Sequence, residues 1–81
     1  MKTVDRGVAL LDERLPGWRD EIEPERLYLG STCNCVLGQL FDDYERGVRI
    51  LGITTPSLFG FTVRGRMTWA NLTAAWRREL R

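Results

Sequence analysis

The sequence predicts a small all-α protein: an irregular or orthogonal three-helix bundle with short extra helical turns and a structured loop before the last helix. Two observations lead to this fold class. Three segments repeat apolar residues at helical spacing, and alternation typical of a strand is limited to one short stretch. The 81 residues are expected to form a single helical domain over 1–81, because a chain of this length builds one compact core.

The first predicted helix covers residues 3–15. Its apolar residues fall at i, i+4, i+7 and i+11 and form one narrow stripe: Val4, Val8, Leu11 and Leu15. Thr3 is the predicted N-cap. Pro16 and Gly17 should end the helix, because proline cannot continue its hydrogen bonding and glycine suits the turn.

The next segment, "WRDEIEPERLYLG", is expected to form one or two short helical turns that cross the core. Six charged side chains surround its apolar ones, which are Trp18, Ile22, Leu27 and Leu29. Pro24 excludes a continuous helix here, and it is well placed in the first turn of "PERLYL".

The second predicted helix is the central one and ends at about Leu51, before Gly52. One face is apolar: Leu37, Leu40, Phe41, Tyr44, Val48 and Leu51. Gly38 and Gly47 each weaken a helix by about 1 kcal/mol relative to alanine. They therefore indicate either close contact with a neighbouring helix or a break near Gly47.

The segment "ITTPSLFGFTVRGRM" is predicted to be a loop with one short extended stretch that turns Phe59 and Phe61 inward. Thr68 then caps the last predicted helix. Its apolar residues repeat at i, i+3, i+7 and i+11: Trp69, Leu72, Trp76 and Leu80. Three arginines point away from that face: Arg77, Arg78 and Arg81. The tryptophans are expected in the core, and one left at the surface would mark an interface.

Cys33 and Cys35 are expected to be structural. If Ser31 or Thr32 caps the central helix, the two side chains diverge by about 200° and cannot hold one ion together. Zinc takes four ligands, and the chain has no histidine and no third cysteine. By the same geometry Cys33 belongs to the core and Cys35 lies nearer solvent. Without a histidine as base, Cys35 is not expected to be a nucleophile.

No catalytic, cofactor or metal site is predicted, so the chain is not expected to be an enzyme. The carboxylates lack calcium-loop spacing, and Gly60 and Gly65 lack the strand–turn–helix setting of a dinucleotide site. No apolar run of about 18 residues is present to cross a membrane. Asp5 and Asp12 interrupt the N-terminus before a signal-like stretch develops, so a cytoplasmic location is expected.

The two parts of the chain differ in charge. Residues 1–45 carry five basic and ten acidic side chains, whereas residues 46–81 carry seven basic and one acidic. The basic part faces either an anionic partner or the protein's own acidic part. We expect a non-enzymatic module that binds another protein, as a monomer or a homodimer, and the alternative is a nucleic-acid-binding accessory factor. The candidate partner-binding residues are Phe59, Phe61, Arg64, Arg66, Arg77, Arg78 and Arg81.

Five stretches spread over nearly the whole chain carry a resemblance: "PGWRDEI", "CNCVLGQLF", "YERGVRILGI", "FGFT" and "LTAAWRREL". Together they resemble a group of small proteins found in actinobacteria and in the tailed phages that infect them. The group has no established activity, so the resemblance assigns no role to any residue. It implies a phage or prophage accessory protein that acts on a bacterial host factor.

Overall fold

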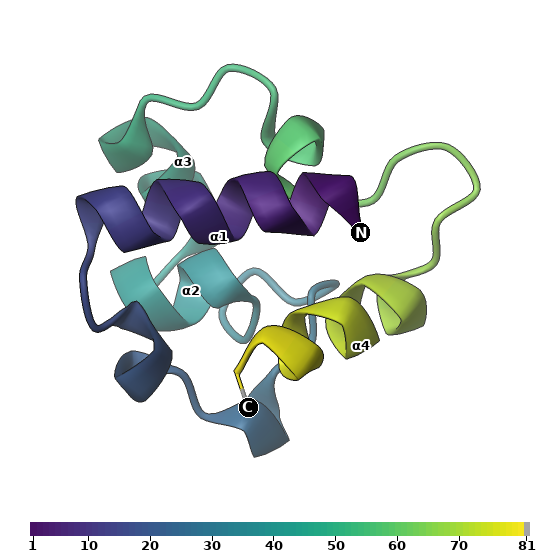
Figure 1. The fold of residues 1–81 in the computed structure, drawn as a ribbon, viewed down its shortest axis with the longest axis horizontal. Coiled ribbons are helices and arrows are strands. Elements are labelled where there is room, and N and C mark those ends of the chain that lie inside the picture. Colours follow the sequence, from purple (N-terminus) through teal and green to yellow (C-terminus); the bar gives the residue numbers. More distant parts are fainter. Residues whose placement is uncertain (81) are drawn as a thin grey trace.

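A computed structural model describes residues 1–80 and confirms the all-α fold class (Figure 1). Within these residues the chain forms the following elements: α1 (Lys2–Arg14), η1 (Trp18–Glu21), η2 (Pro24–Arg26), α2 (Val36–Phe41), α3 (Tyr44–Leu51), η3 (Pro56–Phe59) and α4 (Trp69–Glu79), where η denotes a 3₁₀ helix. The described residues contain no strand, so the short extended stretch expected around Phe59 is instead the 3₁₀ helix η3. Also within residues 1–80, no helix has the length and apolarity needed to cross a bilayer.

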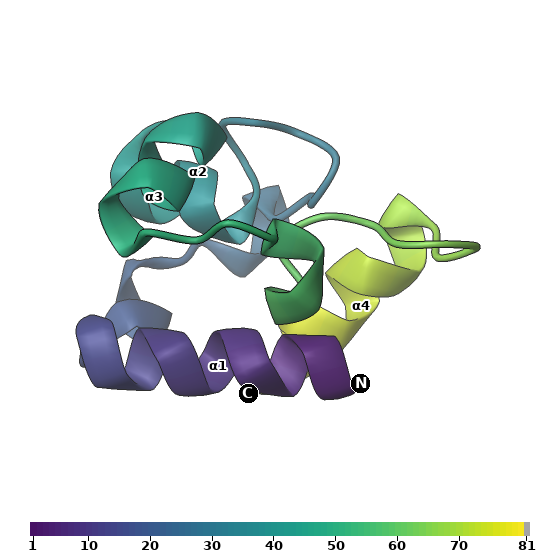
Figure 2. The ribbon, with the colours of Figure 1, turned by 90° about the horizontal axis from the view of Figure 1, so that it is seen from above.

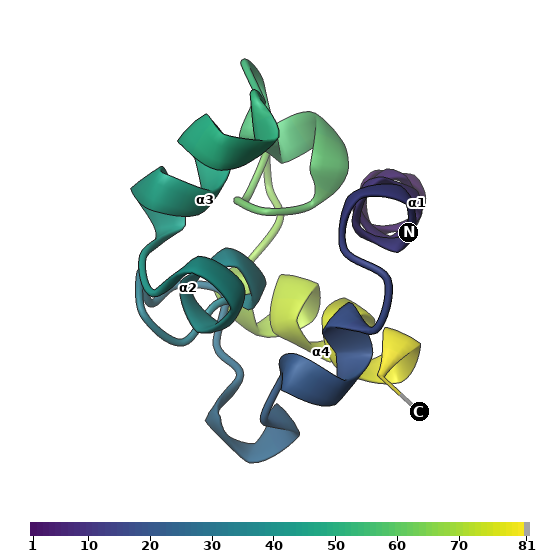
Figure 3. The same ribbon diagram turned by 90° about the vertical axis from the view of Figure 1, so that its left-hand side faces the viewer.

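The helices pack in two groups. Viewed along α1, the pair α2 and α3 lies on one side of the molecule and α1 on the other, with η3 and α4 between them (Figure 3). The main contacts follow this arrangement, since α2 packs on α3 and α1 packs on η3 and α4. The core takes buried side chains from all four α-helices and from the connections between them.

The first helix follows the predicted stripe but not the predicted cap. Val4, Val8 and Leu11 are buried, whereas Leu15 lies just past the end of α1 and is half-buried. The N-cap is Met1, without a side-chain hydrogen bond. Thr3 is thus inside the first turn, and its buried hydroxyl has no partner among the described residues. The prediction of Thr3 as N-cap is wrong because the N-cap lies two residues earlier, at Met1.

Trp76 of α4 organises the core. Its indole nitrogen donates a hydrogen bond of 2.6 Å to the carbonyl oxygen of Gly60. The Phe61 ring stacks on it at a centroid distance of 5.5 Å, and Trp18 meets it edge-on at 5.8 Å. A Cβ added at Gly7 would lie 2.9 Å from the Trp76 ring, so glycine is required for α1 to approach α4 this closely.

The predicted central helix is divided into α2 and α3. Asp42 adopts a left-handed φ of 73°, and Asp43 becomes the N-cap of α3 by accepting hydrogen bonds from the amides of Glu45 and Arg46. The break is therefore at the two aspartates and not near Gly47. Gly47 instead allows close packing of the pair, because a Cβ there would lie 2.8 Å from the Phe41 ring.

The last helix starts as predicted. The Thr68 hydroxyl accepts a hydrogen bond of 3.1 Å from the amide of Asn71, which confirms the N-cap. At the other end of α4, the Nε of Arg19 donates a hydrogen bond of 3.1 Å to the carbonyl oxygen of Glu79. Arg19 also lies 4.7 Å from the centre of the Trp18 ring and pairs with Asp12 at 2.8 Å. This arginine ties the ends of α1 and α4 to η1.

Candidate functional site

The structure separates the residues that the sequence grouped as a partner-binding surface. Arg64 and Arg66 are exposed in the loop before α4, whereas Arg77 and Arg78 are exposed near its C-terminal end. The 11 residues of α4 correspond to a length of about 16 Å, so the two pairs do not form one basic patch. Arg81 lies outside the described residues.

Phe59, Phe61 and Arg77 were also predicted to bind a partner, but each of them makes contacts within the protein. Phe61 is 1% exposed and belongs to the core, which confirms that its ring turns inward and corrects its choice as a partner-binding residue. Phe59 is half-buried under α1, with its ring centroid 6.4 Å from that of Phe61. Arg77 uses its guanidinium to donate a hydrogen bond of 3.2 Å to the carbonyl oxygen of Leu27. These three residues are engaged within the protein.

An aromatic pocket of about 170 Å³ opens beside the start of α4, and we call it the Trp69 pocket. Its lining comes from four separate parts of the chain: Leu29, Gly30, Ser31, Thr32, Tyr44, Phe61, Thr62 and Trp69. The rings of Tyr44, Phe61 and Trp69 supply the apolar surface. The hydroxyls of the serine and threonines supply short hydrogen-bonding groups.

Hydrogen bonds between elements hold the walls of the Trp69 pocket in place. The amide of Leu29 donates to the buried hydroxyl of Thr73 on α4 at 3.0 Å. The amide of Tyr44 donates to the carbonyl oxygen of Thr32 at 2.9 Å, which joins the start of α3 to the preceding loop. Because these bonds join distant parts of the chain, the tertiary fold fixes the walls of the pocket.

Gly30 forms part of the rim between two aromatic side chains. A Cβ added there would lie 2.6 Å from the Tyr28 ring and 3.2 Å from Cγ of Trp69. Tyr28 is 48% exposed, and Trp69 is half-buried. Two large aromatic side chains thus remain accessible next to the opening. Burial raises the pKa of the Tyr44 hydroxyl above its ordinary value.

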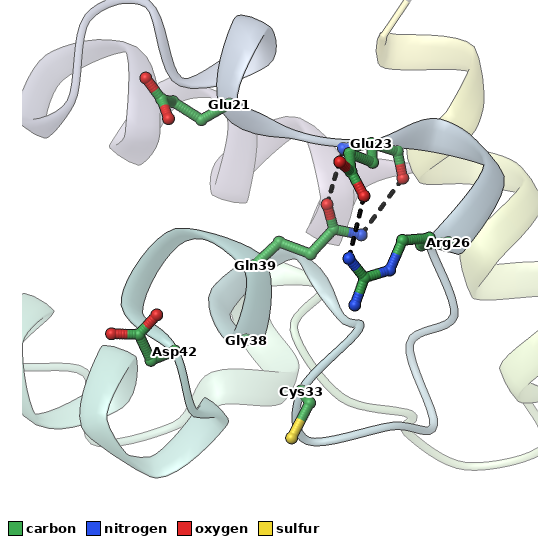
Figure 4. Close-up of a pocket in the computed structure, with 7 residues that line it drawn as sticks. All are labelled: Glu21, Glu23, Arg26, Cys33, Gly38, Gln39 and Asp42. Atoms are coloured by element: carbon green, nitrogen blue, oxygen red, sulfur yellow. Dashed lines mark hydrogen bonds and ion pairs between the residues drawn. The ribbon is translucent and has the colours of Figure 1, made fainter.

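A second pocket, which we call the Cys33 pocket, also uses the connection between η2 and α2, where Cys33 directly follows Thr32 of the Trp69 pocket. It is larger, about 370 Å³, and its lining is mostly polar: Glu21, Glu23, Arg26, Cys33, Gly38, Gln39 and Asp42 (Figure 4). Gln39 accepts a hydrogen bond of 2.7 Å from the amide of Glu23 and donates one of 3.3 Å to its carbonyl oxygen. Arg26 pairs with the Glu23 carboxylate at 3.0 Å. The polar groups of Glu23, Arg26 and Gln39 therefore already have hydrogen-bond or ion-pair partners among themselves.

The remaining acids of the Cys33 pocket do not form a metal site. Figure 4 shows Glu21 and Asp42 apart from the Glu23–Arg26 pair, with the Cys33 thiol at another edge. Within residues 1–80, no three side chains of the His, Cys, Asp and Glu types gather in a way that could hold a metal ion.

The two cysteines take the opposite places from those predicted. Cys33 is exposed, whereas Cys35 is buried and is the N-cap of α2, with its sulfur accepting a hydrogen bond of 3.2 Å from the amide of Gly38. Ser31 and Thr32 therefore do not cap the helix. The helix starts at Val36, so the helical angles assumed for the two cysteines do not apply. Burial raises the pKa of the Cys35 thiol and makes it a poor nucleophile.

Sequence reasoning missed Tyr28, Gly30 and Tyr44 as surface features. One signal for Tyr28 was available: it stands between two leucines in "RLYLG", and alternation in an extended segment puts the middle residue on the other side. Leu27 and Leu29 are indeed buried while Tyr28 is exposed.

Comparison of the chain with protein-family models, with curated proteins and with solved structures gives no match.

Proposed function

We propose that this protein is a non-enzymatic binding module that recognises another protein by accepting one apolar side chain of that partner in the Trp69 pocket. The observation that carries the proposal is the accessible aromatic pocket, with Tyr28 and Trp69 beside its opening. Tryptophan, tyrosine and arginine dominate the residues that contribute most to protein interfaces.

The size of the pocket supports a side chain as its occupant. Small-molecule and cofactor sites usually measure about 300–1,000 Å³. At about 170 Å³ the Trp69 pocket is smaller than this range. Burying one large apolar side chain contributes roughly 1.5–3 kcal/mol, and the surrounding surface adds the rest of an interface. The resemblance described above extends the proposal to a bacterial host protein as partner and to a cytoplasmic location.

The test is a selection from a random peptide library on the immobilised full chain, followed by affinity measurements with the selected peptides. We expect the peptides to share one large apolar residue. Thr62→Phe should fill the pocket and weaken binding by roughly 10-fold or more. Thr54→Phe is the matched control, because Thr54 is exposed and lies outside the lining. It should bind like the parent.

Two results would overturn the proposal. One is equal affinity of the selected peptides for the parent and for Thr62→Phe, which would place binding elsewhere. The other is the absence of any selected peptide, together with a random DNA duplex that binds more weakly as salt increases. That second result would favour the nucleic-acid alternative, since phosphate contacts depend steeply on salt.

A further inference from the structure

The basic part of the chain does not form ion pairs with the acidic part. Residues 46–78 contain six arginines and no acidic residue. The ion pairs found within residues 1–80 are Arg19 with Asp12 and Arg26 with Glu23, and both lie in the acidic part. In the described part of the chain, no arginine of residues 46–78 is therefore paired with a carboxylate. Of the two possibilities for the basic part, this arrangement favours an anionic partner.

The loop of residues 62–68 holds two of these arginines away from the helices. In Figure 1 and in Figure 2 it projects beyond the start of α1, at the same end of the molecule. Its tip is a tight turn in which the amide of Met67 donates to the carbonyl oxygen of Arg64 at 3.2 Å. Gly65 has a φ of +62°, and a Cβ added there would meet no atom within 4 Å. The tip is therefore not packed against the described residues.

The side chains at the tip are almost entirely cationic. Arg64 and Arg66 are both exposed, and Gly65 between them has no side chain. The apolar residues on either side, Val63 and Met67, are half-buried and pack against the core. The tip therefore lacks the exposed apolar side chain that would anchor it in a lipid bilayer or in a pocket of another protein.

The elements at the base of the loop do not cancel its charge. The start of α1 lies there, since a Cβ on Gly60 would be 2.9 Å from Cα of Val4, and residues 1–6 carry two basic side chains and one acidic. The start of α3 reaches the base through the Trp69 pocket, and residues 43–49 carry two basic and two acidic side chains. Neither η3 nor the first turn of α4 contains an acid. The positive charge of the loop is therefore left for a partner.

We infer that the loop of residues 62–68 binds DNA by placing Arg64 and Arg66 in the minor groove of an A·T-rich duplex. This groove is about 6 Å wide, and runs of A·T pairs narrow it and strengthen the negative potential that attracts arginine. A single turn with a glycine at its tip suits so narrow a groove, because the backbone can approach closely. The inference goes beyond the proposed function, since it uses the tip of the loop and not the Trp69 pocket.

The test measures the affinity of the full chain for three labelled duplexes of equal length by fluorescence polarisation. Their central base pairs are A·T, G·C or inosine·cytosine. Inosine lacks the amino group that guanine places in the minor groove, so this duplex has an A·T-like minor groove and a G·C-like major groove. We expect the A·T and inosine duplexes to bind alike and the G·C duplex to bind about 10-fold more weakly. Raising the salt from about 0.05 to about 0.2 M should weaken all binding.

Two double variants that remove the same charge test the loop itself. Arg64→Ser with Arg66→Ser should bind the A·T duplex about 10-fold more weakly and lose the preference over the G·C duplex. Its melting temperature should match that of the parent, because both side chains are exposed. The matched control is Arg14→Ser with Arg78→Ser, at exposed positions on α1 and α4. It should keep the preference for the A·T duplex.

Four results would overturn the inference. Equal affinity for the A·T and G·C duplexes would mean that binding depends on phosphates alone. An inosine duplex that binds like the G·C duplex would assign the preference to the major groove. Equal effects of the two double variants would make it an effect of net charge. Absence of duplex binding, or tighter binding to an RNA duplex or to acidic phospholipid vesicles measured in parallel, would assign the loop another role or none.

All four results leave the proposed function standing, because that function is tested with peptides at the Trp69 pocket. Failure of the peptide selection, in turn, bears on the proposed function and not on the DNA inference.

Discussion

The Cys33 pocket and the Trp69 pocket share one stretch of backbone, since Cys33 lines the first and Thr32 lines the second. The Cys33 pocket has about twice the volume, but its polar groups are engaged with one another through Gln39 and the Glu23–Arg26 pair. The Trp69 pocket is smaller, yet its floor is continuous with the core through Phe61. The comparison favours the Trp69 pocket as the proposed binding site, because the polar groups of the larger pocket are already engaged with one another.

The largest effect is expected from removing the floor of the Trp69 pocket. Phe61→Ala should lower the free energy of unfolding by about 3–5 kcal/mol, because it deletes a buried ring that stacks on Trp76. Phe61→Leu keeps much of the apolar volume and should lose less. Glu21→Ala, in the Cys33 pocket, should change stability by no more than about 0.5 kcal/mol, because Glu21 is exposed. Urea denaturation measures all three.

Equal destabilisation by Glu21→Ala and Phe61→Ala would contradict the contrast drawn above, in which the Trp69 pocket is part of the core and the Cys33 pocket is not.

A smaller effect is expected where the shared loop enters α2. Cys35→Ala removes a buried N-cap and should lower the free energy of unfolding by roughly 0.5–2 kcal/mol. Cys33→Ala, the control at the exposed thiol, should be close to neutral. Equal losses in the two variants, measured by urea denaturation, would contradict the assignment of the cap to Cys35.

The same pair of variants carries a pH dependence. Burial raises the pKa of Cys35 in the folded protein, so on raising the pH the unfolded chain releases this thiol proton first. The folded state therefore loses stability as the pH rises above the ordinary thiol pKa of about 9.0. Cys35→Ala should reduce this loss, whereas Cys33→Ala should retain it.

The smallest effect is expected from metal ions. Adding Zn²⁺ or Ca²⁺ should leave the melting temperature unchanged, because the acids of the Cys33 pocket in the described part of the chain do not converge on a common point. A saturable rise in melting temperature that disappears in Asp42→Asn would reverse the ranking of the two pockets.

Much of the fold could be predicted from local chemistry. Thr68 caps α4 and Gly52 ends α3 with a φ of 68°, as their residue types indicate. The break at Asp42 was missed because the apolar pattern runs on through it from Phe41 to Tyr44. The side chain of Asp43 supplies an acceptor for new helix amides, and this local bonding outweighs the continuity of the pattern.

The candidate site was far less predictable than the fold. The Trp69 pocket joins residues as distant in the sequence as Leu29 and Trp69, and no periodic pattern reports contacts of that range. The sequence grouped the arginines as one basic set. The structure shows that the length of α4 separates Arg64 and Arg66 from Arg77 and Arg78. For Trp69, helical spacing predicted the core, whereas its position at the first turn of α4 leaves part of the indole accessible.

The exposed thiol has a practical consequence. Cys33 follows Thr32 directly in the chain, while Cys35 is shielded by burial, so a maleimide dye would attach selectively at the first of these. The dye would be tethered at the residue next to Thr32, which lines the aromatic cavity. Its emission would then give an optical signal for the proposed binding without any substitution in the sequence, which makes high-throughput screening practical.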